Sequence, residues 1–480
     1  MSNESAKELS PISQLPSKVL ARIFALAKVH CIHRPGRCGC GHSPINDRFH
    51  KFDTFVGVCA RWYTVAVNTP SLWNHIDIGP NTPKRWTRLL LERSKDASLH
   101  VHVYVGAEEP STSAHFSQQQ QSKPEYRVPG AVFVLAPHIQ RVRRLALEIY
   151  ASPGHPAAGI VQLWLNFGSP NPYNSLDIFW PNADQRDVFY WSKLPGIRKD
   201  RLDNYKNMIL SIGYLHWTGV APGRWGQGLF RNLVYLQLEG TTIPLPLPAC
   251  VFLDILLACR DQLETLMLNN ISITPVLGWL GCAPIPMSRL RFLNLIGLEG
   301  EHSMRLVLPL IGLPPIAGER IVLLRVHEHM QDVHAQFFAR SYMTFLHCHT
   351  KFCFAPNRSF MMSLPSVNLL VLSNFNLLKE PVADGVRPIS AMPTHPIPNV
   401  TLWSCPVGFW PMVNLITRHQ VQNLWVRYRP RDCNASAFQI FQSFGIRWVE
   451  IFPGLRCDVS MIEYMGEFPA FEVLTTTSRA

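Results

Sequence analysis

Residues 263–268, LETLML, carry three leucines in the order apolar-x-x-apolar-x-apolar. Residues two apart on a strand point to the same face of a sheet, so Leu266 and Leu268 are expected to be buried together. Met267 is then expected on the opposite face. One such segment predicts a single short strand, and its meaning for the fold depends on whether the pattern recurs.

The pattern recurs along most of the chain, which indicates an array of related units rather than one isolated strand. Written by their three apolar positions, the units are Val142/Leu145/Leu147, Tyr173/Leu176/Ile178, Ile212/Leu215/Trp217, Leu233/Leu236/Leu238, Leu263/Leu266/Leu268, Leu290/Leu293/Leu295, Ile321/Leu324/Val326, Val367/Leu370/Leu372, Ile397/Val400/Leu402, Val421/Leu424/Val426 and Ile446/Val449/Ile451. We expect parallel strands whose second and third positions share one core. The residue between them, such as Gln237 or Asn294, is expected to face solvent.

This recurrence resembles the L-x-x-L-x-L core of leucine-rich repeats. The resemblance implies that residues 98–480 form an irregular α/β solenoid with a curved parallel sheet, which binds a protein target. The units depart from the family pattern, because the asparagine expected late in the consensus is missing from most of them. A plain α/β domain whose strands share a pattern is the alternative interpretation.

The segments between units are expected to return the chain to the next strand. Residues 251–257 and 437–444 are predicted to be such returning helices. Residues 182–207 and 327–366 are too long for one connection, and are predicted to project as loops or extra helices.

Within the N-terminal residues 11–27, PISQLPSKVLARIFALA, residues 15–27 are predicted to be a helix, and Pro16 suits its first turn because its missing N–H would have no partner there. Residues 53–68 predict a second helix, with Asp53 as its cap. Apolar residues at helical spacing predict that the two helices pack on each other. They are Val19, Leu20, Ile23, Phe24 and Ala27 in the first segment, expected as one face, and Phe52, Phe55, Val56, Cys59, Trp62, Tyr63 and Ala66 in the second.

Three motifs in this region resemble the F-box, and most closely the F-box-like modules of large fungal families. They are LP-x-x-[VL]-L-x-x-I-F at residues 15–24, V-C-x-x-W at 58–62 and T-P-S-L-W at 69–73. The resemblance implies that residues 11–78 form a helical module, which docks onto a Skp-type adaptor of a cullin–RING (SCF) ubiquitin ligase. The adaptor-binding residues that it implies are Leu15, Pro16, Leu20, Ile23, Phe24, Val58, Trp62 and Trp73.

Residues 28–51 depart from the F-box pattern, because they form an insertion between the two helices. An ordinary helical subdomain without an adaptor is the alternative interpretation. Residues 79–97 are predicted to be a linker helix, with Thr82 as its cap and Pro83 in its first turn. Alternating apolar residues then predict a strand that starts at Leu99.

The insertion contains a cluster of cysteines and histidines, HCIHRPGRCGCGH, at residues 30–42. Thiolate and imidazole are suitable ligands of structural zinc, although this spacing matches no standard finger. A thiol-rich loop without metal is therefore the favoured interpretation. The zinc candidates are Cys31, Cys38, Cys40 and His42, and a second, weaker cluster consists of His347, Cys348, His349 and Cys353.

The 480 residues include 45 Lys and Arg against 33 Asp and Glu, which gives a formal net charge of +12. Such a balance attracts acidic partners, including nucleic acid. The basic residues are scattered, with small clusters at 141–144 and 427–431. This distribution favours solvated faces over a nucleic-acid groove.

Residues 1–10 are polar and are predicted to be a disordered N-terminus without a secretory signal. No apolar run predicts a membrane span. The 12 cysteines are then expected to be reduced thiols. Together these features indicate the cytoplasm, with the nucleus as the alternative.

Motifs of catalytic sites, such as G-x-S-x-G and the glycine-rich phosphate loops, are missing from the sequence. We therefore expect an α+β multidomain chain that is not an enzyme, needs no cofactor, and serves as the substrate-recognition subunit of an SCF-type ligase. Trp217, Trp403 and Trp425 are candidate anchors for a protein target, with core packing as their alternative role. A repeat scaffold outside a ligase, and a basic nucleic-acid binder organised by zinc, are the alternative functions.

Overall fold

In this computed structural model, the described residues are 11–28, 57–79, 82–105, 130–149, 156–180, 188–189, 202–219, 221–222, 231–241, 244–275, 283–356, 360–361, 363–378, 396–429 and 434–462. The chain divides into two compact units, Met1–Asn232 and Leu233–Ala480. The described residues form an α/β fold, and each unit contains a parallel sheet whose strands follow one another in chain order.

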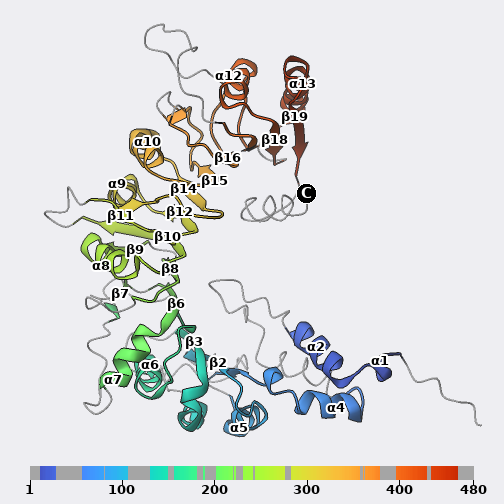
Figure 1. Cartoon of the computed structure of the whole chain (residues 1–480), viewed down its shortest axis with the longest axis vertical. Coiled ribbons are helices and arrows are strands. Elements are labelled where there is room, and N and C mark those ends of the chain that lie inside the picture. The colour runs from blue at the N-terminus through green and yellow to red at the C-terminus, as the bar shows by residue number, and fades with distance from the viewer. Residues whose placement is uncertain are drawn as a thin grey trace, which may run out of the picture. The chain divides into compact units, whose positions relative to one another are not determined.

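The first unit begins with helices and continues as a parallel sheet (Figure 1). The helices are α1 (Pro11–Gln14), α2 (Ser17–Lys28), α4 (Ala60–Val67), η1 (Pro70–Leu72), α5 (Lys84–Arg93), η2 (Gly130–Arg141), α6 (Pro156–Phe167) and α7 (Leu202–Leu210). In sheet order the strands are β1 (His75–Ile78), β2 (Leu99–Val105), β3 (Val142–Ile149), β4 (Asn174–Phe179) and β6 (Ile212–Thr218). A separate small ladder pairs β5 (Val188–Phe189) with β7 (Ala221–Pro222). The predicted strand at Leu99 is confirmed as β2.

The second unit continues the alternation of strands and returning helices. Its strands, in sheet order, are β8 (Tyr235–Glu239), β10 (Thr265–Thr274), β12 (Phe292–Leu298), β14 (Ile321–Arg325), β15 (Phe345–His349), β16 (Leu369–Ser373), β17 (Asn399–Trp403), β18 (Asn423–Tyr428) and β19 (Arg456–Met461). Its helices are α8 (Ala249–Cys259), α9 (Glu301–Leu310), η5 (Glu328–Met330), α10 (Gln331–Ala339), α12 (Phe409–His419) and α13 (Ala435–Ile451). The strand β9 (Leu245–Pro248) pairs with β10, and β11 (Ile285–Pro286) pairs with β13 (Ile311–Gly312).

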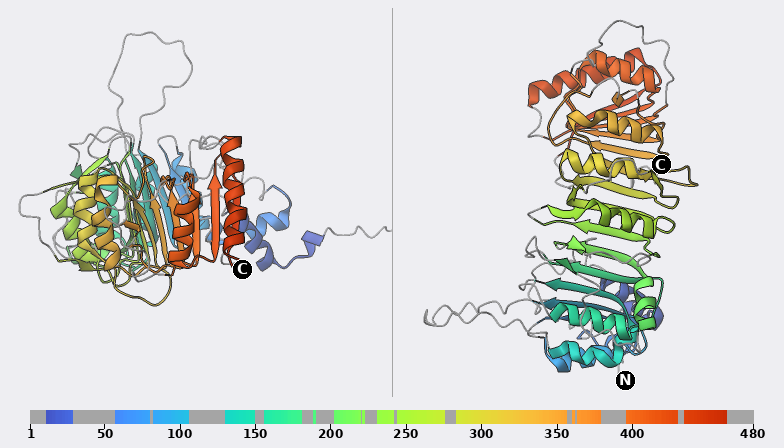
Figure 2. Two further views of the ribbon diagram at one scale, coloured as in Figure 1. Left: turned by 90° about the horizontal axis from the view of Figure 1, so that it is seen from above. Right: turned by 90° about the vertical axis from the view of Figure 1, so that its left-hand side faces the viewer.

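The helices α8, α9, α10 and α12 lie along one face of the strands of the second unit, as Figure 2 shows from two sides. A parallel strand can be added only after the chain has crossed back over the sheet, and these helices make the crossings. The helices predicted at residues 251–257 and 437–444 are confirmed as parts of α8 and α13.

The predicted core positions face these helices and are buried. Leu236, Leu266 and Leu293 stand in register on β8, β10 and β12, and the relative exposure of each is 0%. Leu238 and Leu268, two residues further along β8 and β10, are also paired in register and fully buried. The predicted parallel pairing and the shared core of these strands are therefore confirmed.

Strand β15 was not among the predicted units, although Met343, Leu346 and Cys348 have the same apolar-x-x-apolar-x-apolar spacing. All three side chains are buried. The cysteine at the third position explains why this unit was not predicted. A free cysteine packs in a core like a small apolar residue, although it is usually regarded as a reactive or metal-binding group. Residues 327–366 therefore hold a further strand and the helix α10, whereas most of residues 182–207 lie outside the described residues.

The last predicted unit is wrong, because Ile446, Val449 and Ile451 belong to the helix α13 and are exposed. Apolar residues three apart fit a helix face as well as the first step of the strand pattern. The strand of this region is β19, where only Cys457, Val459 and Met461 alternate on one side.

In the described part of the helix predicted at residues 53–68, residues 57–59 are not helical and α4 begins at Ala60. Cys59 is extended, with φ −163° and ψ 165°, and it is the N-cap residue of α4. Asp53, the predicted cap, lies outside the described residues. In the linker helix α5 the cap position is held by Pro83 rather than Thr82, whose hydroxyl accepts a hydrogen bond from the Gly79 amide.

Arg320 ties together several turns at the ends of the strands in the second unit. Its side chain is fully buried, and its guanidinium donates to the carbonyl oxygens of Leu290 (2.7 Å), Pro314 (2.5 Å) and Tyr342 (3.0 Å). Burial lowers the pKa of this group to about 10, so it remains charged at neutral pH. Carbonyl dipoles thus solvate a buried cation and hold three turns at fixed positions.

Candidate interaction surfaces

Helices α2 and α4 pack on each other at the start of the first unit. Leu20 and Phe24 are buried, and the ring of Phe24 lies 5.0 Å from that of Trp62 between centroids. The indole Nε1 of Trp73 donates a hydrogen bond of 2.7 Å to the carbonyl oxygen of Ala66, which anchors the segment after α4. The predicted packing of these two helices is confirmed.

Large apolar side chains of α1, α2, α4 and the turn before α4 remain on the surface, each between 36% and 56% exposed. They are Ile12, Val19, Ile23, Leu26, Val58 and Tyr63, here called the apolar strip. Val19, Ile23 and Leu26 follow the spacing of one face of α2, beside the face that carries Leu20 and Phe24. Isolated exposed apolar residues are common, whereas a group of this size on a short module is a candidate interaction surface.

The residues implied by the F-box resemblance divide into two sets. Leu20, Phe24 and Trp73 are buried, Leu15 and Trp62 are half-buried, and Pro16, Ile23 and Val58 are exposed. The expectation that Val19 and Leu20 belong to one apolar packing face is wrong, because Leu20 is buried whereas Val19 is 43% exposed. Helical spacing alone could have separated the Val19–Ile23–Leu26 face from the Leu20–Phe24 face.

A second candidate surface is the face of each sheet opposite the leucine core. One residue per strand lies there, between the second and third core positions, and these residues form the outer row. In β14 the core positions in this register are Val322 and Leu324, two residues before the predicted Leu324 and Val326, so Leu323 is its outer residue. In the first unit the outer row is Asp77, His102, Ala146, Asp177 and His216. In the second unit it is Gln237, Met267, Asn294, Leu323, His347, Val371, Thr401, Trp425 and Asp458.

Histidines and carboxylates occupy the outer row of the first unit at every position except Ala146. Asp77 Oδ1 lies 3.1 Å from His75 Nε2 and 3.3 Å from His102 Nδ1. The other ring nitrogen of His102 lies 3.2 Å from Glu148 Oε2. A carboxylate oxygen therefore lies beside each ring nitrogen of His102.

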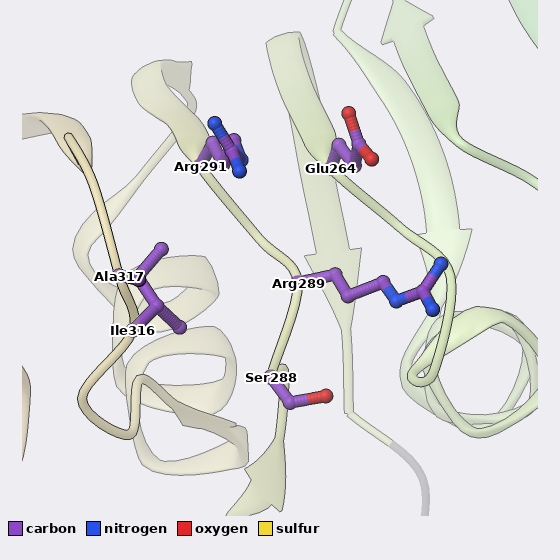
Figure 3. A pocket seen from close by; sticks show the side chains of 6 residues that line it. All are labelled: Glu264, Ser288, Arg289, Arg291, Ile316 and Ala317. Carbon is purple, nitrogen blue, oxygen red and sulfur yellow. The ribbon is translucent and has the colours of Figure 1, made fainter.

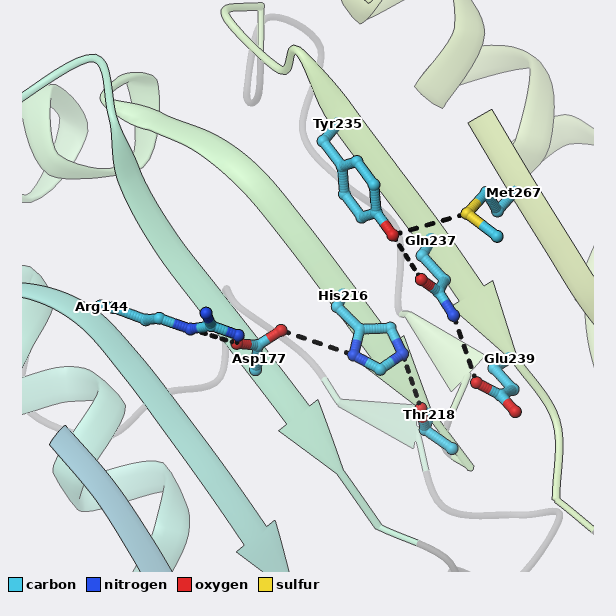
Figure 4. Close-up of polar contacts among 8 residues, drawn as sticks. All are labelled: Arg144, Asp177, His216, Thr218, Tyr235, Gln237, Glu239 and Met267. Carbon is cyan, nitrogen blue, oxygen red and sulfur yellow. Dashed lines mark hydrogen bonds and ion pairs between the residues drawn. The ribbon is translucent and has the colours of Figure 1, made fainter. Parts of the chain in front are cut away.

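A second chain of contacts in the same unit links Arg144, Asp177, His216 and Thr218 (Figure 4). Arg144 Nη2 donates to Asp177 Oδ2 at 2.6 Å, and His216 Nδ1 lies 3.4 Å from Asp177 Oδ1. Burial by itself raises the pKa of Asp177, but the hydrogen bond from His216 and the charge of Arg144 outweigh it and lower the pKa overall. Asp177 is thus a carboxylate at neutral pH.

The order Asp177–His216–Thr218 resembles the carboxylate–imidazole–hydroxyl order of acyl-transfer triads. His216 Nε2 lies 3.1 Å from Thr218 Oγ1. The Thr218 side chain, however, is only 2% exposed and His216 only 6%, so a substrate cannot reach the hydroxyl. We therefore interpret this chain of contacts as a polar network that orders the strands.

In the second unit Gln237 sits between two polar neighbours on β8 (Figure 4). Tyr235 Oη donates to Gln237 Oε1 at 2.5 Å, and Gln237 Nε2 donates to Glu239 Oε2 at 3.3 Å. Gln237 and Asn294 are only 3% and 7% exposed, so the prediction that they face solvent is wrong. They do lie opposite the leucine core, but side chains two residues away on the same strand flank them.

Apolar side chains replace polar ones further along the outer face of the second unit. Ile296, Leu323, Phe345, Leu369 and Val371 are buried against one another, and Phe292, Ile321 and Trp425 pack against them half-buried. These residues are here called the outer apolar cluster. His347 lies between Leu323 and Val371 in register, and its Nε2 is 2.7 Å from Ser373 Oγ. Burial, with a contribution from His349, lowers the pKa of His347 to about 3.

The candidate tryptophan anchors have different surroundings. Trp217 is fully buried at the third core position of β6, so it packs in the core. Trp403 is 7% exposed, and the guanidinium of Arg429 lies 5.9 Å from its ring centroid. Trp425 is half-buried beside the outer apolar cluster. Only Trp425 among the three combines an outer position with substantial exposure.

The zinc candidates Cys31, Cys38, Cys40 and His42 lie outside the described residues. In the second cluster, Cys348 points into the core while its neighbours His347 and His349 lie on the outer side of β15. These side chains therefore diverge. Within the described ranges, no group of three or more histidine, cysteine or acidic side chains is arranged to hold a metal.

The small basic clusters contact groups of their own unit. Arg141 Nη2 donates to Ser94 Oγ at 2.6 Å, and Arg143 Nη1 donates to the Ser169 carbonyl oxygen at 2.8 Å. Arg427 Nη1 lies 2.5 Å from Asp458 Oδ2. These guanidinium groups hold turns and strands together, which favours a structural role over a nucleic-acid groove.

A cavity of about 260 Å³ opens at the ends of β10 and β12 (Figure 3). It is lined by Glu264, Ser288, Arg289, Arg291, Ile316 and Ala317. Arg289 Nη1 donates to Gln262 Oε1 at 2.6 Å, and Ser288, Arg289 and Arg291 are exposed. Sites for small molecules are mostly enclosed and apolar. This cavity is a polar surface groove.

No model of a known protein family matches the chain, and a comparison with curated proteins finds no relative. Within the part of the chain that the structure describes, no helix combines the length and the apolar character needed to cross a membrane.

Proposed function

We propose that this chain is the substrate-recognition subunit of an SCF-type ubiquitin ligase. Residues 11–78 would be the F-box-like module, and residues 98–480 a leucine-rich-repeat-like solenoid with a curved sheet. The apolar strip is the observation that carries this proposal. It supplies an exposed apolar surface on the helices whose motifs resemble the F-box, while Leu20 and Phe24 hold those helices together.

The proposed mechanism is proximity rather than covalent catalysis by this chain. The N-terminal module binds the Skp-type adaptor, the strand array binds a protein target, and the ligase then meets the target at a high effective concentration. The role needs no catalytic residue and no cofactor in this chain. It also implies a location where cullin–RING ligases act, in the cytoplasm or the nucleus.

The target-binding end is proposed to be the outer face of the strands. The half-buried Phe292, Ile321 and Trp425 border the outer apolar cluster and offer aromatic and aliphatic contact area. Aromatic residues at such positions commonly dominate the energy of protein interfaces.

Co-purification with a Skp-type adaptor tests the proposal. The wild-type chain is expected to retain the adaptor, and the double variant Ile23→Glu/Leu26→Glu is expected to lose it, because two charges then lie within the apolar strip. Leu257→Glu is the matched control, since Leu257 is a 45% exposed leucine on α8. The proposal is overturned if the wild type retains no adaptor, or if the double variant retains as much as the control.

A repeat scaffold outside a ligase gives a different result in the same experiment. Such a protein would bind no adaptor, whereas substitutions at Trp425 would still weaken the capture of a protein target. Binding of the adaptor therefore distinguishes the two functions.

A further inference from the structure

Strand β19 forms the outer end of the sheet in the second unit. The amides of Arg456 and Ile462 donate toward β18, to the carbonyl oxygens of Gln422 (2.8 Å) and Tyr428 (3.0 Å). Backbone groups of a strand alternate in direction, so the amides of Cys457, Val459 and Met461 point away from β18. Among the described residues no strand pairs with that side. Such an edge is a template for a further strand.

Helix α13 lies against this edge strand and uses two of its sides for contacts within the unit. Phe444 and Trp448 face α12, with ring centroids 5.6 Å and 6.3 Å from that of Phe409. Gly445 faces β19, where a Cβ atom would lie 2.9 Å from Val459 Cγ2 and 3.5 Å from Cys457 Sγ. The missing side chain of Gly445 thus lets α13 lie directly over Cys457.

A third side of α13 remains exposed and continues the edge. Ile446 and Val449 are 64% and 37% exposed, and their spacing of three puts them on the same flank of the helix. This flank is turned away from Phe444 and Trp448, and so away from α12. Backbone donors and acceptors of β19 and apolar side chains of α13 therefore form one continuous surface.

We propose that this surface binds a second copy of the chain. The two β19 strands would pair antiparallel about a two-fold axis at Cys457, so that the sheets of the two copies continue into each other. Cys457 has its backbone groups directed outward, as the central hydrogen-bonded pair of such a ladder requires. The helices α13 of the two copies then lie on the same side of the joined sheet.

Charge complementarity identifies a second copy as the occupant. In this register Arg456 of each copy lies opposite Asp458 of the other copy. Both are non-hydrogen-bonded pairs, in which the side chains lie closer together. The surface is therefore complementary to itself, which is what a two-fold interface requires. Because Gly445 lies over Cys457, the neighbouring Ile446 comes close to the axis and contacts the same helix of the second copy.

Sedimentation of the full chain over a range of concentrations tests this proposal. The wild type is expected to dimerise, and Arg456→Asp or Asp458→Arg alone should raise the dimer Kd at least about tenfold, because like charges then face each other. The double variant R456D/D458R should restore dimerisation, because opposite charges face each other again. Asp458 also pairs with Arg427 within the chain, and the double variant does not restore that pair. Restoration therefore reports the contact between copies.

A second comparison places α13 in the interface. Ile446→Glu should weaken the dimer at least about tenfold. Ile440→Glu is its matched control, because Ile440 is 51% exposed on the same helix but one turn before Phe444, toward α12. A chain that stays monomeric at every concentration overturns the proposal. So does a double variant as weak as the single ones, or an Ile440→Glu variant as weak as Ile446→Glu.

Discussion

The outer rows of the two units occupy the same position in the strand pattern but differ in chemistry. In the first unit this position carries Asp77, His102, Asp177 and His216, which join through ion pairs and hydrogen bonds. In the middle of the second unit it carries Leu323 and other residues of the outer apolar cluster. The core positions on the other side of the strands are apolar and buried in both units.

The difference indicates that burial fixes one face of each strand and leaves the other face free to vary. The core positions must be apolar in every strand, because they are buried on the face of the sheet that the helices cover. The outer row accepts either polar or apolar residues, and most of its residues in the second unit are themselves buried. A target is therefore proposed to contact the half-buried residues of that face, such as Phe292, Ile321 and Trp425.

The largest effect is expected where the two units are alike. Leu215→Ala in the first unit and Leu266→Ala in the second should each lower the free energy of unfolding by about 2–5 kcal/mol, through lost burial and a cavity. Both side chains are fully buried. Chemical denaturation of the two variants provides the measurement. A cost below about 1 kcal/mol at either position would contradict a shared type of core.

A smaller effect is expected in the outer apolar cluster. Leu323→Ala should cost about 2 kcal/mol, at the lower end for buried leucines, because half-buried neighbours such as Phe292 can move toward the gap. Chemical denaturation of Leu323→Ala and of Leu266→Ala compares the two losses of unfolding free energy. If Leu323→Ala has no effect, the cluster does not contribute to the stability of the second unit.

The outer rows of the two units should also respond to different ranges of pH. The pKa of His347 is about 3 in the folded chain against an ordinary 6.5, so the unfolded chain binds more protons between these values. Stability is therefore expected to fall as pH drops below about 6.5, by up to about 1.4 kcal/mol per pH unit from this residue. Asp177 has a pKa lowered from 3.8, so its contribution is lost only in more acidic solution.

Thermal unfolding of the wild type and of His347→Gln between pH 7 and pH 4 measures this effect. The variant should show a shallower loss of stability, although not a flat one, because burial also lowers the pKa of His334 and His349. Identical pH profiles would show that His347 is not buried as a neutral ring.

The smallest effect is expected at Gln237. Gln237→Ala should cost about 1 kcal/mol, because its amide exchanges hydrogen bonds with Tyr235 and Glu239 while the rest of β8 is unchanged. Denaturation of Gln237→Ala beside Gln442→Ala, an exposed glutamine on α13, checks this value. Equal stability of the two variants would show that the hydrogen bonds of Gln237 with Tyr235 and Glu239 do not contribute to stability.

Local spacing predicted the core well, because Leu236, Leu266 and Leu293 need only their own strand and one buried face. It could not identify β15, where Cys348 takes a leucine position, or separate α13 from a strand at Ile446 and Val449. The burial of Gln237 depends on its neighbours Tyr235 and Glu239, and the sequence pattern contains no such information. Among the site residues, helical spacing could have distinguished Val19 from Leu20.

The central claim is that the apolar strip binds a Skp-type adaptor, and the affinity of the purified chain for that adaptor tests it most directly. The proposal predicts saturable binding by the wild type, and Val19→Glu should weaken it at least about tenfold because a charge replaces an apolar contact. Leu257→Glu should bind like the wild type. Absence of binding by the wild type, or equal affinities of Val19→Glu and Leu257→Glu, would contradict the claim.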